Sequence, residues 1–341
     1  MSKTAKIWLV IFAALILVGI IILGGVLAMV KWDFSKLFTV KYETNNYEVS
    51  DFQSISIATN TADITLSPTE SEKASVTCFE QSSLRHSVNV KNGTLMVEVT
   101  DNRKWYEYIG ICFKSPKITI CLPAEEYENL LIKNSTGNVE ISEAFKFKNF
   151  DISTTTGDIV NRASALNEMK LKTSTGNIKV ENVSASSMDF SVTTGKIVVT
   201  GAECSENIAI GVSTGEASLQ DVACKNLTSK GNTGEMLLIN TVASEKLSIE
   251  RTTGDVKLDR CDAAELWIKT DTGDVKLDRC DAVELWIKTD TGDITGTLLS
   301  DKIFFAETDT GRVDVPKSLI GGKCEVVTDT GDIKFRVITE E

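Results

Sequence analysis

DVKLDRCDAAELWIKTDTG, residues 255–273, is followed directly by DVKLDRCDAVELWIKTDTG, residues 274–292. The two copies differ at one position, where Ala264 of the first copy is Val283 in the second. A folded chain tolerates a tandem copy of this kind when each copy is a structural unit that contacts only its neighbours. The duplication therefore sets the length of one structural repeat at nineteen residues.

Each copy ends in Thr-Gly, and this dipeptide recurs along most of the chain. Its eleven glycines are spaced by 19 or 20 residues and are Gly137, Gly157, Gly176, Gly195, Gly215, Gly234, Gly254, Gly273, Gly292, Gly311 and Gly331. Helical repeats need about 33 residues and propeller blades about 40–45. The period therefore favours a solenoid in which each repeat forms one coil.

Apolar and polar residues alternate within each repeat. In the first copy, Val256 and Leu258 form one alternating pair, and Leu266 and Ile268 form a second. This period of two is typical of a half-buried strand. We therefore predict an all-β fold over residues 132–341, a parallel β-solenoid of about eleven coils of 19–20 residues, with coils about 4.8 Å apart.

The Thr-Gly dipeptide is expected to form a corner of the coil. Glycine reaches the positive φ that a sharp corner needs. The preceding Thr is expected to form hydroxyl hydrogen bonds between coils or to pack its methyl group inward. An Asp or Asn that often follows the glycine can bond the backbone of the turn.

The N-terminal segment predicts a membrane anchor. Residues 7–30 contain no charge, and about 20 apolar residues suffice to cross a bilayer as a helix. The apolar part of a cleaved signal peptide is shorter, about 7–15 residues, although Val26-x-Ala28 resembles a weak cleavage site. Lys3 and Lys6 favour a cytoplasmic location for residues 1–6, which places the body that follows residues 7–30 outside the cytoplasm.

Residues 31–46 are interpreted as a linker and residues 47–131 as an irregular β-rich head that caps the solenoid. Ile55 to Leu66 follow the repeat pattern with Ala62 in the place of the glycine, as in a degenerate coil. At the other end, the strand Ile333–Val337 has no cap after it. Such an open edge permits end-to-end self-association.

These features together resemble a known bacterial family. The strand Ile118–Pro123 in the head and the corners Ser135–Asn138 and Thr155–Asp158 are similar to those of the putative-adhesin family of β-strand-repeat proteins, a domain of unknown function. The resemblance covers residues 47–341. It implies a β-solenoid at the bacterial surface or envelope, where some members are similar to accessory proteins of envelope-stress systems, and it brings no catalytic residue.

Composition argues against nucleic-acid binding and against most enzyme chemistry. The net charge is −12, which is unfavourable for contact with phosphate backbones. The single histidine, His86, gives little basis for a Ser/His/Asp or a multi-histidine metal site. The Asp residues recur in every late coil, as scaffold residues do. We expect no catalytic residue and no cofactor.

Eight cysteines lie outside the predicted membrane span. Cys204 and Cys224 lie one repeat apart, as do Cys261 and Cys280. Stacked positions fall within disulfide range, but buried thiols that fill the core are the preferred interpretation. In the head, Cys112 and Cys121 are the best candidates for a disulfide.

Calcium is a weaker hypothesis for the last corners. Three of them read Asp-Thr-Gly-Asp and supply Asp271, Asp274, Asp290, Asp293, Asp329 and Asp332. Stacked carboxylates can hold a hard cation. Capping of each turn by its Asp explains the same residues without a metal.

Aromatic residues form the most distinctive candidate surface. Trp267, Trp286 and Phe305 share one position of the coil and alternate with inward residues, so a column on the outer face is predicted. Such a column can bind a sugar or a protein, or it can only stabilise the sheet. Trp105, Tyr106 and Tyr108 in the head are a second candidate surface.

The sequence therefore predicts a non-enzymatic, membrane-anchored, extracytoplasmic β-solenoid. Its leading function is an adhesin-like interaction with an envelope protein or glycan. An envelope-stress accessory or sensor that acts with a membrane signalling partner is the alternative, and a polysaccharide-acting enzyme is the third.

Overall fold

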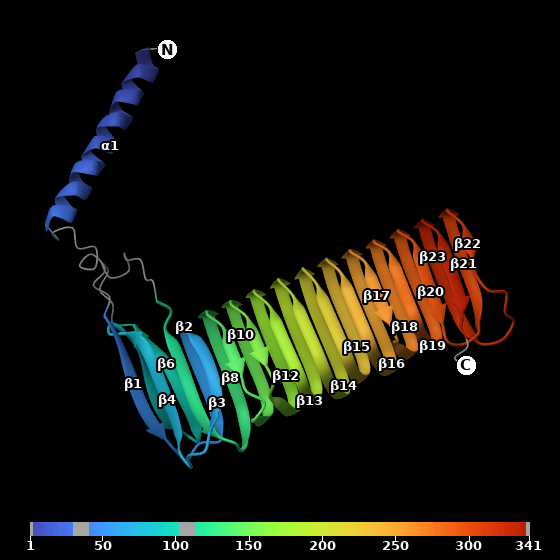
Figure 1. Ribbon diagram of the computed structural model, residues 1–341, viewed down its shortest axis with the longest axis horizontal. Helices are drawn as coiled ribbons and strands as arrows, with labels where there is room; N and C mark the ends of the chain where they lie inside the picture. The colour runs from blue at the N-terminus through green and yellow to red at the C-terminus, as the bar shows by residue number, and fades with distance from the viewer. Residues whose placement is uncertain (1–2, 30–40, 102–113, 339–341) are drawn as a thin grey trace.

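A computed structural model describes residues 3–29, 41–101 and 114–338 (Figure 1). Its one α-helix among these residues, α1 (Lys3–Met29), contains residues 7–29 of the predicted anchor. The stretch Ala5–Met29 is long enough to cross a membrane, and an 18-residue window within it has a mean hydropathy of 3.1. A signal sequence meets the same test of length and composition.

The remaining described elements are strands, which confirms the all-β prediction. The N-terminal strands are β1 (Tyr42–Val49), β2 (Ser54–Thr61), β3 (Asp63–Thr69), β4 (Ala74–Gln81), β5 (Leu84–Lys91), β6 (Thr94–Asp101) and β7 (Lys117–Pro123). The repeats supply β8 (Glu126–Thr136), β9 (Val139–Ile141), β10 (Lys146–Thr156), β11 (Ile159–Asn161), β12 (Ser164–Thr175), β13 (Ile178–Thr194), β14 (Ile197–Thr214), β15 (Ala217–Thr233), β16 (Met236–Thr253), β17 (Val256–Asp259), β18 (Asp262–Thr272) and β19 (Val275–Thr291). The last strands are β20 (Ile294–Leu298), β21 (Lys302–Thr310), β22 (Val313–Asp314), β23 (Gly322–Thr330) and β24 (Ile333–Val337).

The repeats stack as parallel coils of a β-solenoid, as predicted. In the duplicated segment, β18 and β19 pair so that Leu266 lies opposite Leu285 and Ile268 lies opposite Ile287. Each residue of the first copy thus meets its own duplicate. The tandem copy is one complete coil of the solenoid.

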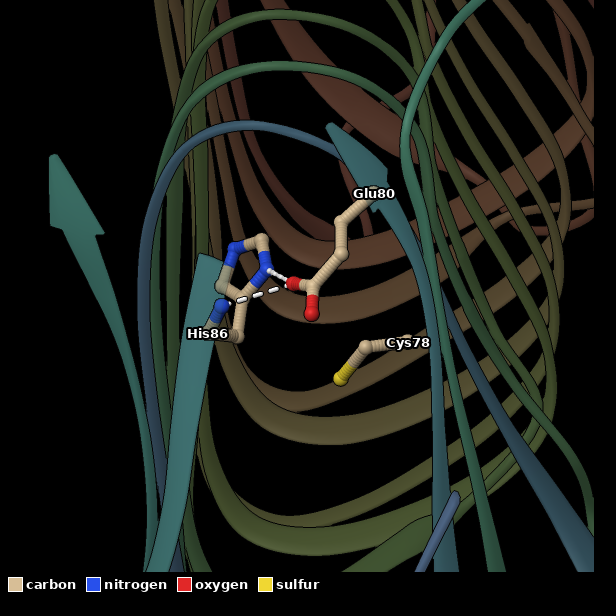
Figure 2. A group of neighbouring side chains, drawn as sticks. All are labelled: Cys78, Glu80 and His86. Carbon is tan, nitrogen blue, oxygen red and sulfur yellow. Dashed lines mark hydrogen bonds and ion pairs between the residues drawn. The ribbon is translucent and has the colours of Figure 1, made fainter. Parts of the chain in front are cut away.

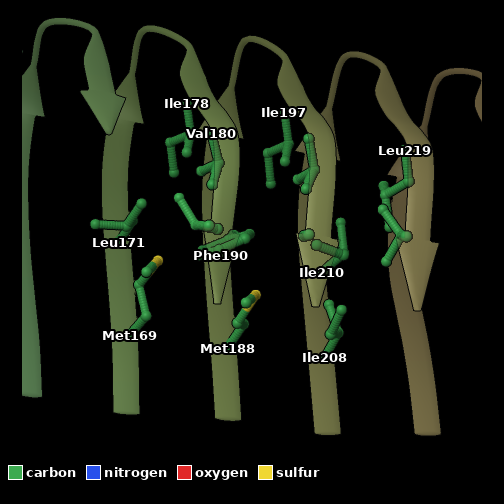
Figure 3. Close-up of a cluster of buried hydrophobic side chains, with 14 of the residues drawn as sticks. Met169, Leu171, Ile178, Val180, Met188, Phe190, Ile197, Ile208, Ile210 and Leu219 are labelled. Carbon is green, nitrogen blue, oxygen red and sulfur yellow. The ribbon is translucent and has the colours of Figure 1, made fainter. Parts of the chain in front are cut away.

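The interior is a set of apolar columns that run along the solenoid axis. Leu171, Phe190 and Ile210 occupy one column in three successive coils (Figure 3). These side chains are at most 2% exposed. Full burial of such a side chain contributes about 1.5–3 kcal/mol to folding. Stacking is what buries them, because a single coil has no opposing layer.

The corner glycines allow the coils to approach closely. Gly273 has φ +150°, and a Cβ atom there would lie 2.2 Å from the carbonyl oxygen of Gly254. The hydroxyl bonds between coils do not come from the Thr of the dipeptide, since Thr272 is exposed. In several coils they come from a Thr three residues before the glycine, as where Thr289 Oγ1 donates to the Gly273 carbonyl at 3.2 Å.

In one of the other coils, an arginine occupies this position. Arg251 is 3% exposed and fits because Gly231 lies opposite it in the preceding coil. Its guanidinium donates to Ser229 Oγ at 2.8 Å. Burial lowers the pKa of Arg251 to about 10.

The N-terminal strands continue the solenoid and then close it. Strand β2 pairs in parallel with β8 and strand β3 with β9, so Ile55 to Leu66 form the predicted degenerate coil. One layer further out, β6 and β7 pair in parallel with β2 and β3. Strands β4 and β5 then pair antiparallel with β7 and β6, and β1 pairs antiparallel with β4 (Figure 1). This antiparallel layer covers the N-terminal end.

At the C-terminal end, the chain order and the spatial order of the coils differ. Strands β23 and β24 lie between the coil of β19 and β20 and the outermost strands β21 and β22 (Figure 1). The interpretation of Ile333–Val337 as the open edge was therefore wrong. Ile333 and Phe335 are fully buried in the inner layer, whereas Val313 of the two-residue β22 is exposed. The later segment therefore takes the inner place and buries its apolar side chains there.

Candidate functional site

Two tryptophans lie stacked on the outer face of the solenoid. Trp267 on β18 and Trp286 on β19 have ring centroids 4.9 Å apart and ring planes 6° apart. Their neighbours Leu266 and Ile268 point into the core. Both indoles are half-buried. The alternation of each strand therefore places the aromatic pair outside, as predicted.

Charged side chains flank the tryptophan pair and form with it a shallow pocket of about 190 Å³. On one side, Lys246 pairs with Glu265 at 3.1 Å. On the other side, Lys323 pairs with Glu325 at 2.6 Å. The hydrogen bond from Lys323 lowers the pKa of the Glu325 carboxyl. Carboxylates and ammonium groups thus border the apolar rings.

Both ends of the tryptophan stack lack a third ring. Ser248 lies opposite Trp267 in the preceding coil. Glu325 of β23 lies opposite Trp286 in the following layer, and Phe305 of β21 lies beyond Glu325. The prediction of a three-membered column was therefore wrong, because β23 is inserted before β21. Phe305 is 55% exposed, and Lys323 Nζ lies 5.7 Å from its ring centroid.

The sequence also predicts a second aromatic surface, in the head. Trp105, Tyr106 and Tyr108 lie outside the described residues.

In the acidic corners, the Asp that follows the glycine accepts a hydrogen bond from the neighbouring coil. Asp274 Oδ1 accepts the backbone N–H of Asp293 at 2.8 Å, and Asp293 Oδ1 accepts that of Asp332 at 2.8 Å. This arrangement is turn capping across coils. In the part of the chain that the structure describes, none of the six corner Asp residues belongs to a group of three or more ligating side chains whose ligand atoms lie within 4.8 Å of one another.

One group of three ligating side chains does exist among the described residues (Figure 2). It lies in the antiparallel layer of β1, β4 and β5, which we call the cap. The group consists of Cys78 and Glu80 on β4 and His86 on β5, and their side chains are fully or almost fully buried. Glu80 Oε2 accepts the backbone N–H of His86 at 2.6 Å and lies 2.7 Å from His86 Nδ1. Burial, and then the nearby Glu80 carboxylate, raise the pKa of the Cys78 thiol to about 12.

A family model decides the identity of the chain. The model of Toastrack DUF4097 matches residues 52–218 and 206–340. The chain belongs to the Toastrack DUF4097 family. This confirms the resemblance to adhesin-like repeat proteins of unknown function. No curated protein sequence matches the chain.

Several solved structures are similar to this Toastrack protein over most of their length. A putative adhesin from Bacteroides fragilis NCTC 9343 is 15% identical, covers 87% of this chain and 97% of its own, and has a TM-score of 0.31. A putative adhesin from Parabacteroides merdae ATCC 43184 is 11% identical, with 88% and 98% covered and a TM-score of 0.32. A putative lipid binding protein from Parabacteroides distasonis ATCC 8503 is 12% identical, with 88% and 98% covered and a TM-score of 0.29.

The described cysteines of the Toastrack protein are free thiols. Cys204, Cys224, Cys261 and Cys280 are buried, and Cys121 is half-buried. Cys112, its predicted disulfide partner, lies outside the described residues.

Sequence reasoning missed the cluster of Cys78, Glu80 and His86. Cys78 and Glu80 are two positions apart, so a strand places them on the same face. This spacing could have been noticed in the sequence. A Glu on the inward face of a strand is unusual, because a buried Glu needs a partner, and the single histidine follows six residues later. The antiparallel pairing that brings the β5 histidine to the β4 pair was not predicted.

Proposed function

We propose that this Toastrack protein is a membrane-anchored, extracytoplasmic scaffold that binds an envelope glycan or protein through Trp267 and Trp286. The observation that carries this proposal is the uncovered end of the stack. Ser248 is the residue opposite Trp267, and no third ring follows it in that coil. A pyranose or an aromatic side chain can continue the stack there.

The charged border of the pocket suits a polar ligand. Glu265, Glu284 and Glu325 border the pocket and can accept hydrogen bonds from hydroxyl groups, while Lys246 and Lys323 can donate them. A ring face surrounded by hydrogen-bonding groups is the arrangement that recognises sugars, since a sugar has apolar C–H faces and polar edges. No step of this proposal requires catalysis.

The helix α1 supports the proposed location. Lys3 and Lys6 precede its apolar stretch, and positive residues favour the cytoplasmic side. The solenoid would then stand outside the cell with its outer tryptophans accessible to envelope components.

Binding to a glycan array tests the proposal. The full chain in detergent should bind a subset of envelope glycans, and Trp286→Ala should weaken binding by roughly tenfold or more, in the range of a lost hot-spot contact. Val283→Ala is the matched control, because Val283 is also outward and is 65% exposed. It should bind normally.

Equal binding by Trp286→Ala and the unchanged chain would remove the tryptophan pair from the function. If no glycan binds and a membrane signalling protein co-purifies with the chain instead, the alternative of an envelope-stress accessory would replace the adhesin-like one.

A further inference from the structure

The cap contains a set of buried metal-ligating groups that the proposed function does not use. Cys78 and Glu80 point inward from β4, and His86 points toward them from β5 (Figure 2). The exposed fractions are 0%, 0% and 3%. The sulfur, a carboxylate oxygen and a ring nitrogen all lie within 4.8 Å of one another.

We propose that Cys78, Glu80 and His86 form a zinc site. Zinc is bound in proteins by thiolate sulfur, imidazole nitrogen and carboxylate oxygen, and this cluster supplies one of each. Calcium and magnesium prefer sets made only of oxygen ligands. Three protein ligands leave one position of a tetrahedral ion for a non-protein ligand such as water.

The groups around the cluster are arranged as the outer shell of a metal site usually is. His86 Nε2 lies 2.8 Å from Thr59 Oγ1, so that nitrogen can carry the proton while Nδ1 faces Cys78 and Glu80. Asn45 Nδ2 donates to Glu80 Oε1 at 2.7 Å and leaves Oε2 toward the histidine. Bonds of this kind fix the tautomer and the orientation of metal ligands.

The charges of the three ligands also suit a bound Zn²⁺ ion, which would replace the proton of the Cys78 thiol. Zn²⁺ with one thiolate, one carboxylate and a neutral imidazole has no net charge, which suits a buried site. Binding releases the Cys78 thiol proton to solvent, together with the Nδ1 proton if the imidazole carries one. The distance of 2.7 Å between Glu80 Oε2 and His86 Nδ1 would open to about 3.3 Å, because bonds from zinc to nitrogen or oxygen are about 2.0–2.2 Å long.

The site would link three parts of the N-terminal end. Thr59 belongs to the first coil, Asn45 to the edge strand β1, and the ligands to the antiparallel hairpin β4–β5. A bound ion would therefore hold the cap on the solenoid. Any ligand that binds only the folded state stabilises it.

Cobalt binding by the full chain in detergent, after removal of metals with a chelator, tests the site. Co²⁺ replaces zinc and reports a thiolate ligand through a charge-transfer absorption band. We expect one equivalent to bind with this band, and Zn²⁺ to displace it. We also expect Zn²⁺ at a hundredfold excess over its Kd to raise Tm by about 5 °C or more.

Cys78→Ser and His86→Gln should abolish the band and the rise in Tm. Cys121→Ser is the matched control, because Cys121 lies on the neighbouring strand β7 and is not a ligand. It should keep both. X-ray absorption of the unmodified zinc-loaded chain gives an answer even if a variant fails to fold, and one sulfur among nitrogen and oxygen ligands is expected.

Two results would overturn the proposal. The first is absence of the cobalt band together with an unchanged Tm. The second is a first shell with two sulfurs, which would place the metal at a pair of cysteines in the solenoid, Cys261 with Cys280 or Cys204 with Cys224.

Discussion

The corner glycines are the residues that the coil geometry constrains most. They have φ between +129° at Gly137 and +156° at Gly311, and a Cβ atom at each would lie about 2 Å from a carbonyl oxygen of the neighbouring coil. Ala62 occupies a corner without a positive φ. It lies in the degenerate coil next to the cap, where the regular stack of corners ends.

Gly273→Ala should destabilise the protein by roughly 3 kcal/mol or more, because both the backbone conformation and the carbonyl of Gly254 exclude a side chain. Denaturant unfolding of the full chain in detergent measures the change. Gly211→Ala is the control. Gly211 lies in β14 of the same solenoid, and the nearest atom to an added Cβ there is 3.6 Å away. A similar loss for both variants would contradict the assignment of the corner as the constrained position.

At the scale of one element, the coil is the unit that is duplicated in the sequence. The fold accommodates the extra copy as one more coil. Residues 255–273 and 274–292 pair in register, and each also pairs in parallel with the layer on its other side. In a solenoid, stability is approximately a sum over units and over the interfaces between neighbours. Removal of one whole unit joins two surfaces that already fit.

Deletion of residues 274–292 should therefore leave a folded protein with the same strand content and a somewhat lower Tm. Circular dichroism during heating measures both. Deletion of residues 274–282 is the contrasting variant, since it removes half a coil and shifts the following strand by an odd number of residues, which exchanges its inner and outer faces. It should unfold or aggregate. If the whole-coil deletion behaved as badly, the coil would not be the independent unit.

At the scale of the whole molecule, the spatial order of the last coils is the property that the repeat pattern predicts incorrectly. Counting nineteen residues from Lys288 leads to Glu307, whereas the structure places Val327 opposite Lys288. Glu307 lies one layer further out, opposite Val327.

Cysteine cross-linking distinguishes the two orders. Lys288→Cys with Val327→Cys should form a disulfide under mild oxidation, because adjacent strands are about 4.8 Å apart and disulfides need Cα atoms within about 4.4–6.8 Å. Lys288→Cys with Glu307→Cys spans two layers and should remain reduced. Mobility on a non-reducing gel after proteolysis reads out the linkage. Efficient linkage of the second pair alone would restore the sequential order.

Some features of the candidate sites follow from the repeat pattern, and others depend on the tertiary structure. The stacked pair of Trp267 and Trp286 could be predicted, because it follows from one position repeated at the coil period. The separation of Phe305 from that pair could not be predicted, because it depends on which later strand, β21 or β23, pairs directly with β19. The meeting of His86 with Cys78 and Glu80 depends on an antiparallel hairpin in a segment without periodicity.

The sequence by itself determined the coil length, the two inward-facing strands of each coil and the glycine corners. These are local properties, set by the alternation of apolar residues and by backbone conformations that only glycine adopts easily. The tertiary structure alone decided how the two ends are built. There, segments far apart in the chain can pair with the same layer, and the alternation within each segment does not decide which one does: Ile333 and Phe335 lie buried in the inner layer, whereas Val313 is exposed.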